Sequence, residues 1–454
     1  MFDSLCFRKQ ERGIRGRGCA WALRLALCCL AIVWLVRFCH PQTITSYQRG
    51  QAQEMLQYVA DDVKKNYYDP NLNGLDWDAK VREAKEKIDK ADSMNRALSA
   101  IASALNTFND SHTFFLPPAR PYVHQYGFTM RMIGNRCYVI RVRPGSDAEK
   151  KGVKVGDEVL SVNGYTPTRQ NFWQMQYVFN TLRPQPDLEL DLRSPEGAEH
   201  KLDVEAKMRE LTTIRDLTTA EGIADYFRQI ENEEHADRIR YVEKGHGLLI
   251  VQFPAFDFSY EEINSLVGKM RGHDAVILDL RGDSGGSEET LKALLSGVLE
   301  DKMKIFDRVT RKQTKPVESD TFKNGFSGKL VVLIDSRSAS ASELFARVVQ
   351  LQKRATVMGD LSAGAVMEAR HFGHKQGADT VVFYGASVTE ANLVMTDGKS
   401  LEHVGVTPDT LLLPTAADLA AGRDPVLAKA AESLGVQLSA EEAGKFFPYE
   451  WSAQ

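Results

Sequence analysis

The main body of this chain has almost no cysteine. Only Cys137 lies there, and the other cysteines lie in or beside an apolar segment near the N-terminus: Cys6, Cys19, Cys28, Cys29 and Cys39. A single cysteine cannot form an internal disulfide, and no cysteines are spaced in pairs as in a zinc site. The body must therefore be stabilised by its hydrophobic core.

The chain also lacks an excess of positive charge and a phosphate-binding glycine motif between a strand and a helix. Its 57 basic and 61 acidic residues give a net charge of −4, so nothing pulls the whole molecule towards nucleic acid. With 454 residues, 43% of them hydrophobic and 26% charged, the composition is that of a globular protein of several domains.

The first 44 residues have the layout of a membrane anchor. The run from Ala20 to Cys39 is apolar apart from Arg24 and Arg37, and is about long enough to cross a bilayer. Basic residues precede it: Arg8, Lys9, Arg12, Arg15 and Arg17. The alternative, a buried core helix, fits these charges poorly. We predict an uncleaved signal anchor with residues 1–18 in the cytoplasm and the body periplasmic or extracellular.

The rest of the chain divides by its residue patterns. We expect a helical domain at residues 45–120, a domain of short strands at 121–208 and a helical connector at 209–245. A domain of alternating strands and helices should follow at 246–415, and a C-terminal helical segment at 416–454. The runs "GLLIVQF", "DAVILDL" and "KLVVLID" are continuously apolar, as in strands buried on both faces, so the fourth domain is predicted to be a layered α/β fold.

The domain of short strands resembles a PDZ domain, through the segment "GSDAEKKGVKVGDEVLSVNG" and the strand order around it. The resemblance implies that Tyr126, Gly127, Phe128 and Thr129 form the loop that receives a peptide C-terminus, with the peptide added as a strand. The alternative is a β domain that binds no peptide.

The stretch "IDSRSASASELFARV", residues 334–348, places serines at alternate positions between a strand and a helix. A serine at a helix N-terminus faces free N–H groups that favour negative charge, which suits a nucleophile. The competing reading is an ordinary helix cap. A second glycine loop, "DLRGDSGGS", could supply oxyanion donors from Gly285 and Gly286, together with the N–H of Ala341.

These motifs, with "LEHVGVTPD" at 401–409, resemble those of the C-terminal processing (tail-specific) serine peptidases and the related tricorn protease over residues 45–415. The resemblance implies a crotonase/ClpP-like layered α/β catalytic domain, preceded by or containing the PDZ-like domain, behind an N-terminal helical domain. It also implies that Ser340 is the nucleophile, with Ser338 and Ser342 in support.

The chain departs from this family at the general base. The tail-specific branch uses a lysine, but Ala365 stands at the matching place. Lys353 is roughly 20 Å from Ser340 along the helix, too far to replace it. The tricorn branch implies His112 as the base and Glu402 as the residue that orients it. Alternatives remain for both roles: His371, His374 and His403 for the base, and Asp110 and Glu368 for the acid.

The sequence thus predicts a membrane-anchored serine endopeptidase with a Ser-His-Glu mechanism, acting on polypeptides whose C-terminus the PDZ domain engages. It needs no metal or other cofactor, has no nucleic-acid partner, and is compatible with a homo-oligomer. Ala365 motivates an alternative: an inactive family member that binds peptides or hydrophobic ligands. A third reading has the PDZ domain occlude the site until a ligand moves it.

Overall fold

The structure is a computed structural model. It describes residues 44–449 and 451, apart from the segments 212–215, 220–221, 223–237, 246, 321–323 and 378–380. The predicted anchor at residues 1–43 lies outside the described residues, and none of the helices that are described is long and apolar enough to cross a membrane.

The predicted α/β domain is built on a six-stranded sheet in the order β18-β15-β14-β11-β10-β9. Its strands are β9 (Arg240–Lys244), β10 (Leu248–Gln252), β11 (Ala275–Asp279), β14 (Lys329–Ile334), β15 (Thr356–Gly359) and β18 (Thr410–Leu411). All neighbours are parallel except β9 and β10. Alternate residues such as Leu249 and Ile250 enter separate apolar clusters on the two faces, so the sheet is buried on both sides, as the apolar runs predicted.

Helices cover both faces of this sheet. On one face lie α8 (Tyr260–Met270), α9 (Glu288–Val298) and α10 (Ala341–Leu351), and on the other lie α12 (Pro425–Ser433) and α13 (Ala440–Ala443). Helix α8 begins with a capping box, in which the side chains of Ser259 and Glu262 each accept from the other's backbone N–H. The short α11 (Ala416–Ala420) completes the C-terminal segment and contacts the PDZ-like domain at Gly156.

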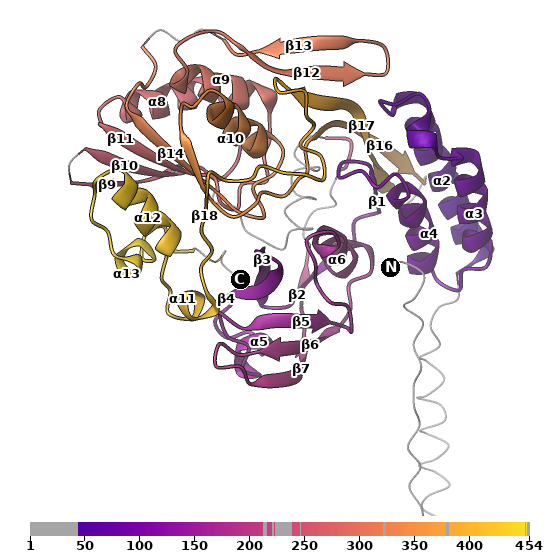
Figure 1. The fold of residues 1–454 in the computed structure, drawn as a ribbon. Coiled ribbons are helices and arrows are strands. Elements are labelled where there is room, and N and C mark those ends of the chain that lie inside the picture. The colour runs from indigo at the N-terminus through magenta and orange to yellow at the C-terminus, as the bar shows by residue number, and fades with distance from the viewer. Residues whose placement is uncertain are drawn as a thin grey trace, which may run out of the picture.

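A second sheet joins the N-terminal helices to the α/β domain. It has the order β1-β17-β12-β13, with β16 also paired to β17. Its strands are β1 (Phe114–Leu116), β12 (Lys304–Thr310), β13 (Thr314–Glu318), β16 (Met367–Gln376) and β17 (Val382–Met395). Helices α2 (Ser46–Asn66), α3 (Trp77–Asp89) and α4 (Met94–Asn106) share a core with this sheet and lie beside it in Figure 1. The predicted helices are therefore present, and they pack on strands from distant sequence.

The domain of short strands has a five-stranded antiparallel sheet, β3-β4-β5-β6-β7, with β3 at its edge. Its elements are β3 (Phe128–Ile133), β4 (Arg136–Val142), α5 (Asp147–Lys150), β5 (Glu158–Val162), α6 (Phe172–Tyr177), η2 (Val178–Leu182), β6 (Asp187–Arg193) and β7 (Glu199–Glu205). Helical elements and the antiparallel β6–β7 hairpin accompany the short strands. Figure 1 places this domain below the α/β domain, next to the N-terminal helices.

The prediction of a helical connector at 209–245 is wrong at both ends of this range, where the structure has strands. Strand β8 (Lys207–Glu210) pairs with β2 (Tyr122–Gln125), and β9 adds to the edge of the six-stranded sheet. Most of the segment between them lies outside the described residues. The polar composition misled the prediction, because all of β8 is exposed and β9 alternates half-buried with exposed residues.

Candidate active site

Ser340 occupies a sharp turn between β14 and α10. Its φ of 53° lies in the left-handed region, which costs free energy for a residue with a side chain. The backbone N–H of Ser340 donates to Ala365 O at 3.0 Å and to Glu343 Oε2 at 3.1 Å, which holds this conformation. Ser338 and Ser342 are fully buried, whereas Ser340 is half-buried. Of the three alternate serines, only Ser340 is open to a substrate.

The glycine loop lies directly against Ser340. A Cβ on Gly285 would come within 2.7 Å of Ala339 O, 2.8 Å of the Ser340 Cβ and 3.0 Å of the Ala341 nitrogen. The N–H of Gly285 donates to Asp283 Oδ1 at 2.7 Å and is therefore occupied. Among the described residues no hydrogen bond is made by the N–H of Gly286 or Ala341. Gly285 thus leaves space beside Ser340, and the N–H groups that remain free are those of Gly286 and Ala341.

His112 is linked to Glu402 through the hydroxyl of Ser111, a residue that the sequence did not indicate. The His112 Nδ1 lies 2.7 Å from Ser111 Oγ, and that hydroxyl donates to Glu402 Oε2 at 2.8 Å. The backbone N–H of Ser111 donates to Glu402 Oε1, also at 2.8 Å. Glu402, which was predicted to orient the imidazole, is linked to it in the structure through the Ser111 hydroxyl.

The segment 362–366 connects this histidine cluster to Ser340. Ala365 O accepts the Ser340 N–H, and the N–H of the next residue, Val366, donates to Glu402 Oε2 at 2.9 Å. The place where the family resemblance implies a lysine is therefore adjacent to Ser340. In this chain a methyl group stands there.

The alternative bases and acids have other partners. His374 Nε2 lies 2.6 Å from Asp62, and His403 Nε2 lies 2.7 Å from Asn109 O. His371 lies near His112, where burial and then the charge of His112 lower its pKa to about 4. The two rival acids, Asp110 and Glu368, are engaged by Thr389 and Arg308 respectively.

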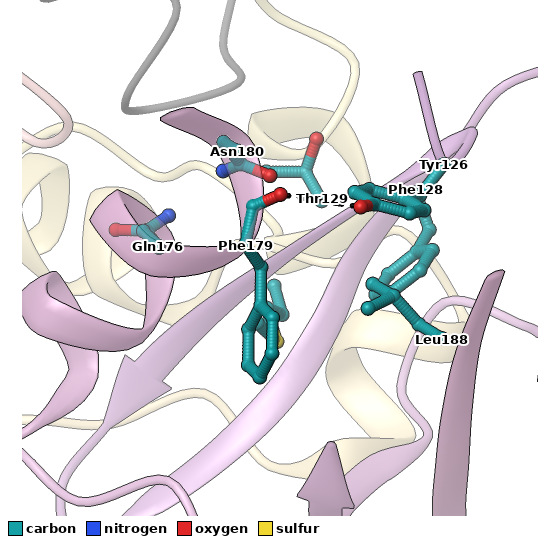
Figure 2. Close-up of a pocket in the computed structure, with 8 residues that line it drawn as sticks. Tyr126, Phe128, Thr129, Gln176, Phe179, Asn180 and Leu188 are labelled. Atoms are coloured by element: carbon teal, nitrogen blue, oxygen red, sulfur yellow. Dashed lines mark hydrogen bonds between the residues drawn. The ribbon is translucent and has the colours of Figure 1, made fainter. Parts of the chain in front are cut away.

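The PDZ-like domain has a pocket between its edge strand β3 and the helix α6–η2 (Figure 2). It holds about 370 Å³ of empty space, including the open groove above it. The lining is mainly apolar and aromatic, with polar groups at the rim: Tyr126, Phe128, Thr129, Met130, Gln176, Phe179, Asn180 and Leu188. Tyr126, Phe128 and Thr129, predicted to receive a peptide, all line it.

The loop residues beside the pocket are held firmly. Tyr126 is buried, and its hydroxyl donates to Gln185 O at 3.0 Å and to Phe179 O at 3.2 Å. Gly127 has a φ of 78°, and a Cβ there would lie 2.4 Å from the Ser146 Cβ, so only glycine fits. An unpaired strand edge beside an apolar pocket can accept an extended peptide.

Two arginines of the PDZ-like domain hold the loops that carry the Ser340 site. Arg131, on β3, pairs with Asp335 at 2.6 Å, five residues before Ser340. Arg169 pairs with Asp360 at 2.6 Å, at the start of the segment that carries Ala365. Burial alone would raise the pKa of Asp335, but the Arg131 charge holds it below its usual value. The PDZ-like domain is thus joined by direct ion pairs to the loops on either side of Ser340.

Comparisons with known proteins match two regions of this chain. The family description "Peptidase family S41" matches residues 247–412, and "PDZ domain" matches residues 119–182. The tail-specific protease of Haemophilus influenzae is 23% identical over 364 residues, covering 73% of this chain and 49% of that protein. The carboxyl-terminal-processing protease of Synechocystis is 22% identical over 411 residues, covering 86% of this chain and 87% of that protein.

Among solved structures, that of mature CPAF has a TM-score of 0.62 at 16% identity, over 83% of this chain and 95% of that chain. This likeness is one of fold. The chain spans about half the length of the Haemophilus protein and most of the Synechocystis protein.

Proposed function

We propose that this chain, which matches Peptidase family S41 over residues 247–412 and a PDZ domain over residues 119–182, is a serine peptidase that cleaves polypeptides with Ser340 as nucleophile and His112 as general base. The observation that carries the proposal is the hydrogen-bonded series His112–Ser111–Glu402, which reaches Ser340 through the segment 362–366. Glu402 and Ser111 orient the imidazole in place of a direct carboxylate contact.

The hydrogen bonds select the tautomer of His112. Because the Ser111 hydroxyl donates to Glu402, its oxygen is left to accept from His112 Nδ1–H. A neutral imidazole protonated at Nδ1 has a free lone pair on Nε2, which can then take the proton of a serine hydroxyl. The negative charge of Glu402 stabilises the imidazolium that results.

The proposed reaction has two halves. The Ser340 oxygen attacks the scissile carbonyl carbon while His112 accepts its proton, and the N–H groups of Ala341 and Gly286 stabilise the oxyanion. The imidazolium then protonates the leaving amine as the C–N bond breaks. Water, activated by the same imidazole, hydrolyses the ester to release the second product and restore the Ser340 hydroxyl.

We further propose that the PDZ groove selects substrates with a free C-terminus and that the peptidase is membrane-anchored with its body outside the cytoplasm. The edge strand β3 and the apolar pocket beside it support the first part, and the basic and apolar pattern of residues 8–39 supports the second. The inactive alternative rests on Ala365 alone, whereas the chain keeps the residues proposed as nucleophile, general base and oxyanion donors.

A matched pair of substrates tests this function. We expect the full chain to cleave an unstructured polypeptide that ends in small apolar residues, and Ser340→Ala to leave it uncut. The same polypeptide with an amidated C-terminus should be cleaved with a KM at least about 10-fold higher, because a buried carboxylate contact is lost. Equal kinetics would show that the groove does not read the carboxylate. Binding of both substrates without cleavage of either would favour the inactive alternative.

Removing the bridging hydroxyl should slow the chemical step. We expect Ser111→Ala to lower kcat by roughly 10- to 100-fold with little change in KM, as for other groups that orient a reacting side chain. Ser111→Thr keeps a hydroxyl and should restore most of the rate. Steady-state kinetics on the free-acid substrate provides the measurement, and an unchanged kcat in Ser111→Ala would show that Glu402 and His112 are not coupled through this residue.

A further inference from the structure

Glu343 is a fully buried carboxylate beside the nucleophile, and within the described part of the chain it contacts no cation. It is the third residue of helix α10. Its Oε1 accepts from Ser362 Oγ at 2.6 Å and from the Gly364 N–H at 2.8 Å. Its Oε2 accepts from the N–H groups of Ala365 at 3.0 Å and Ser340 at 3.1 Å. Each oxygen therefore receives two donors.

These contacts attach three parts of the site to one side chain. The first is the backbone of Ser340, and the second is the segment 362–366, whose next N–H, that of Val366, donates to Glu402. The third is the turn after Glu402, because Ser362 Oγ also accepts from the Val406 N–H at 2.6 Å. The segment 362–366 is thus held between two glutamates, Glu343 at the nucleophile and Glu402 at the histidine.

From this arrangement we infer that Glu343 is a positioning residue of the peptidase reaction: its ionised carboxylate fixes Ser340 against the segment that leads to Glu402 and His112. The inference deepens the proposed function and depends on it. A chain with no lysine at 365 cannot hold its base on this segment, so the distance between nucleophile and histidine depends on how firmly the segment is anchored.

A glutamine amide or a protonated carboxylic acid at position 343 could not accept all of these hydrogen bonds. Either would place an O–H or N–H group opposite donors that already point inward, leaving buried N–H groups unsatisfied. An ordinary glutamate at the third position of a helix behaves differently, because glutamine serves equally well there. Glu262 of α8 is such a residue, exposed and bonded to the Ser259 backbone.

Protonation of Glu343 should have opposite effects on activity and on stability: it should lower the activity and stabilise the fold. Burial, opposed by hydrogen bonds from Ser362, Ala365, Gly364 and Ser340, raises the pKa of Glu343 from 4.5 to about 7. A carboxyl whose pKa is raised by folding stabilises the fold when it is protonated, and this contribution is lost as pH rises through 7. The groups in contact with Glu343 are all uncharged, and the nearest carboxylate along the segment is Glu402. Lowering the pH from 7 towards 4.5 should therefore cost activity while this group favours the folded state.

The experiment compares Glu343→Gln with Glu262→Gln in the full chain, measuring kcat, KM, the thermal midpoint and the rate of fluorophosphonate labelling at Ser340. We expect Glu343→Gln to lower kcat and labelling by roughly 10- to 100-fold with KM within about 2-fold. Glu262→Gln should match the wild type in all four readouts.

Ser362→Ala removes one of the donors and keeps the carboxylate, so it should lower kcat by about 3- to 10-fold even if Glu343→Gln does not fold. A wild-type labelling rate in folded Glu343→Gln, or an unchanged kcat in Ser362→Ala, would overturn the inference. A wild-type protein that is not labelled at Ser340 would instead refute the proposed function itself.

Discussion

Replacing His112 by alanine should lower kcat by about 10³- to 10⁴-fold with a small change in KM, because the Ser340 hydroxyl then has no group to take its proton. The variant should fold normally, since His112 is half-buried and its backbone N–H to Asp110 is kept. Steady-state kinetics on the free-acid polypeptide, with a thermal melt as the folding check, makes the measurement.

His374→Ala is the matched control for this change. Its imidazole pairs with Asp62 on helix α2, away from Ser340, so kcat should stay within about 2-fold of wild type. His371 is the more demanding comparison because it lies near His112. A large loss in His371→Ala together with a small loss in His112→Ala would move the general base from His112 to His371.

Adding one methyl group to Gly285 should also disable the site. The new Cβ would lie within 3.0 Å of the Ala341 nitrogen, and so would crowd the N–H that we propose as an oxyanion donor. We expect Gly285→Ala to lower kcat by roughly 10²- to 10³-fold, comparable to the loss of an oxyanion donor. Because φ at this position is +99°, the variant should also lose about 1–3 kcal/mol of stability.

Gly268→Ala in helix α8 is the control for the glycine change. It lies in the same domain, and its nearest contact is the end of the flexible Arg271 side chain at 3.5 Å. It should be neutral in kcat and more stable by up to about 1 kcal/mol, since alanine is the better helix former. If Gly285→Ala retained full activity with a normal melt, the oxyanion site would have to lie elsewhere than at Ala341.

The sequence predicted the parts of the fold that local patterns determine. Continuous apolar runs identified β10, β11 and β14 because strands buried on both faces need no polar side. The long strands β16 and β17 were not predicted. The first, "MEARHFGHKQ", alternates charged with small or aromatic residues and gains its pairing only from β17. Which partner a strand finds depends on contacts far apart in the chain, which local composition does not record.

The same limit applies to the site. The strand-turn-helix pattern and the family resemblance together indicated Ser340, and the resemblance alone indicated His112. Ser111 was overlooked because a serine beside a histidine has no signature of its own until Glu402, far along the chain, is brought next to it. In the sequence Glu343 has the pattern of a helix-capping residue. Its burial and its contacts arise only because the segment 362–365 folds over it and donates hydrogen bonds to its carboxylate.

The most direct test of a histidine-activated Ser340 is to treat the full chain with a fluorophosphonate, digest it and locate the adduct by mass spectrometry. We expect the adduct on Ser340 and on neither Ser338 nor Ser342, with its rate of formation lost in His112→Ala. An adduct on another serine, or one that forms on Ser340 at the same rate without His112, would contradict the mechanism proposed for this peptidase.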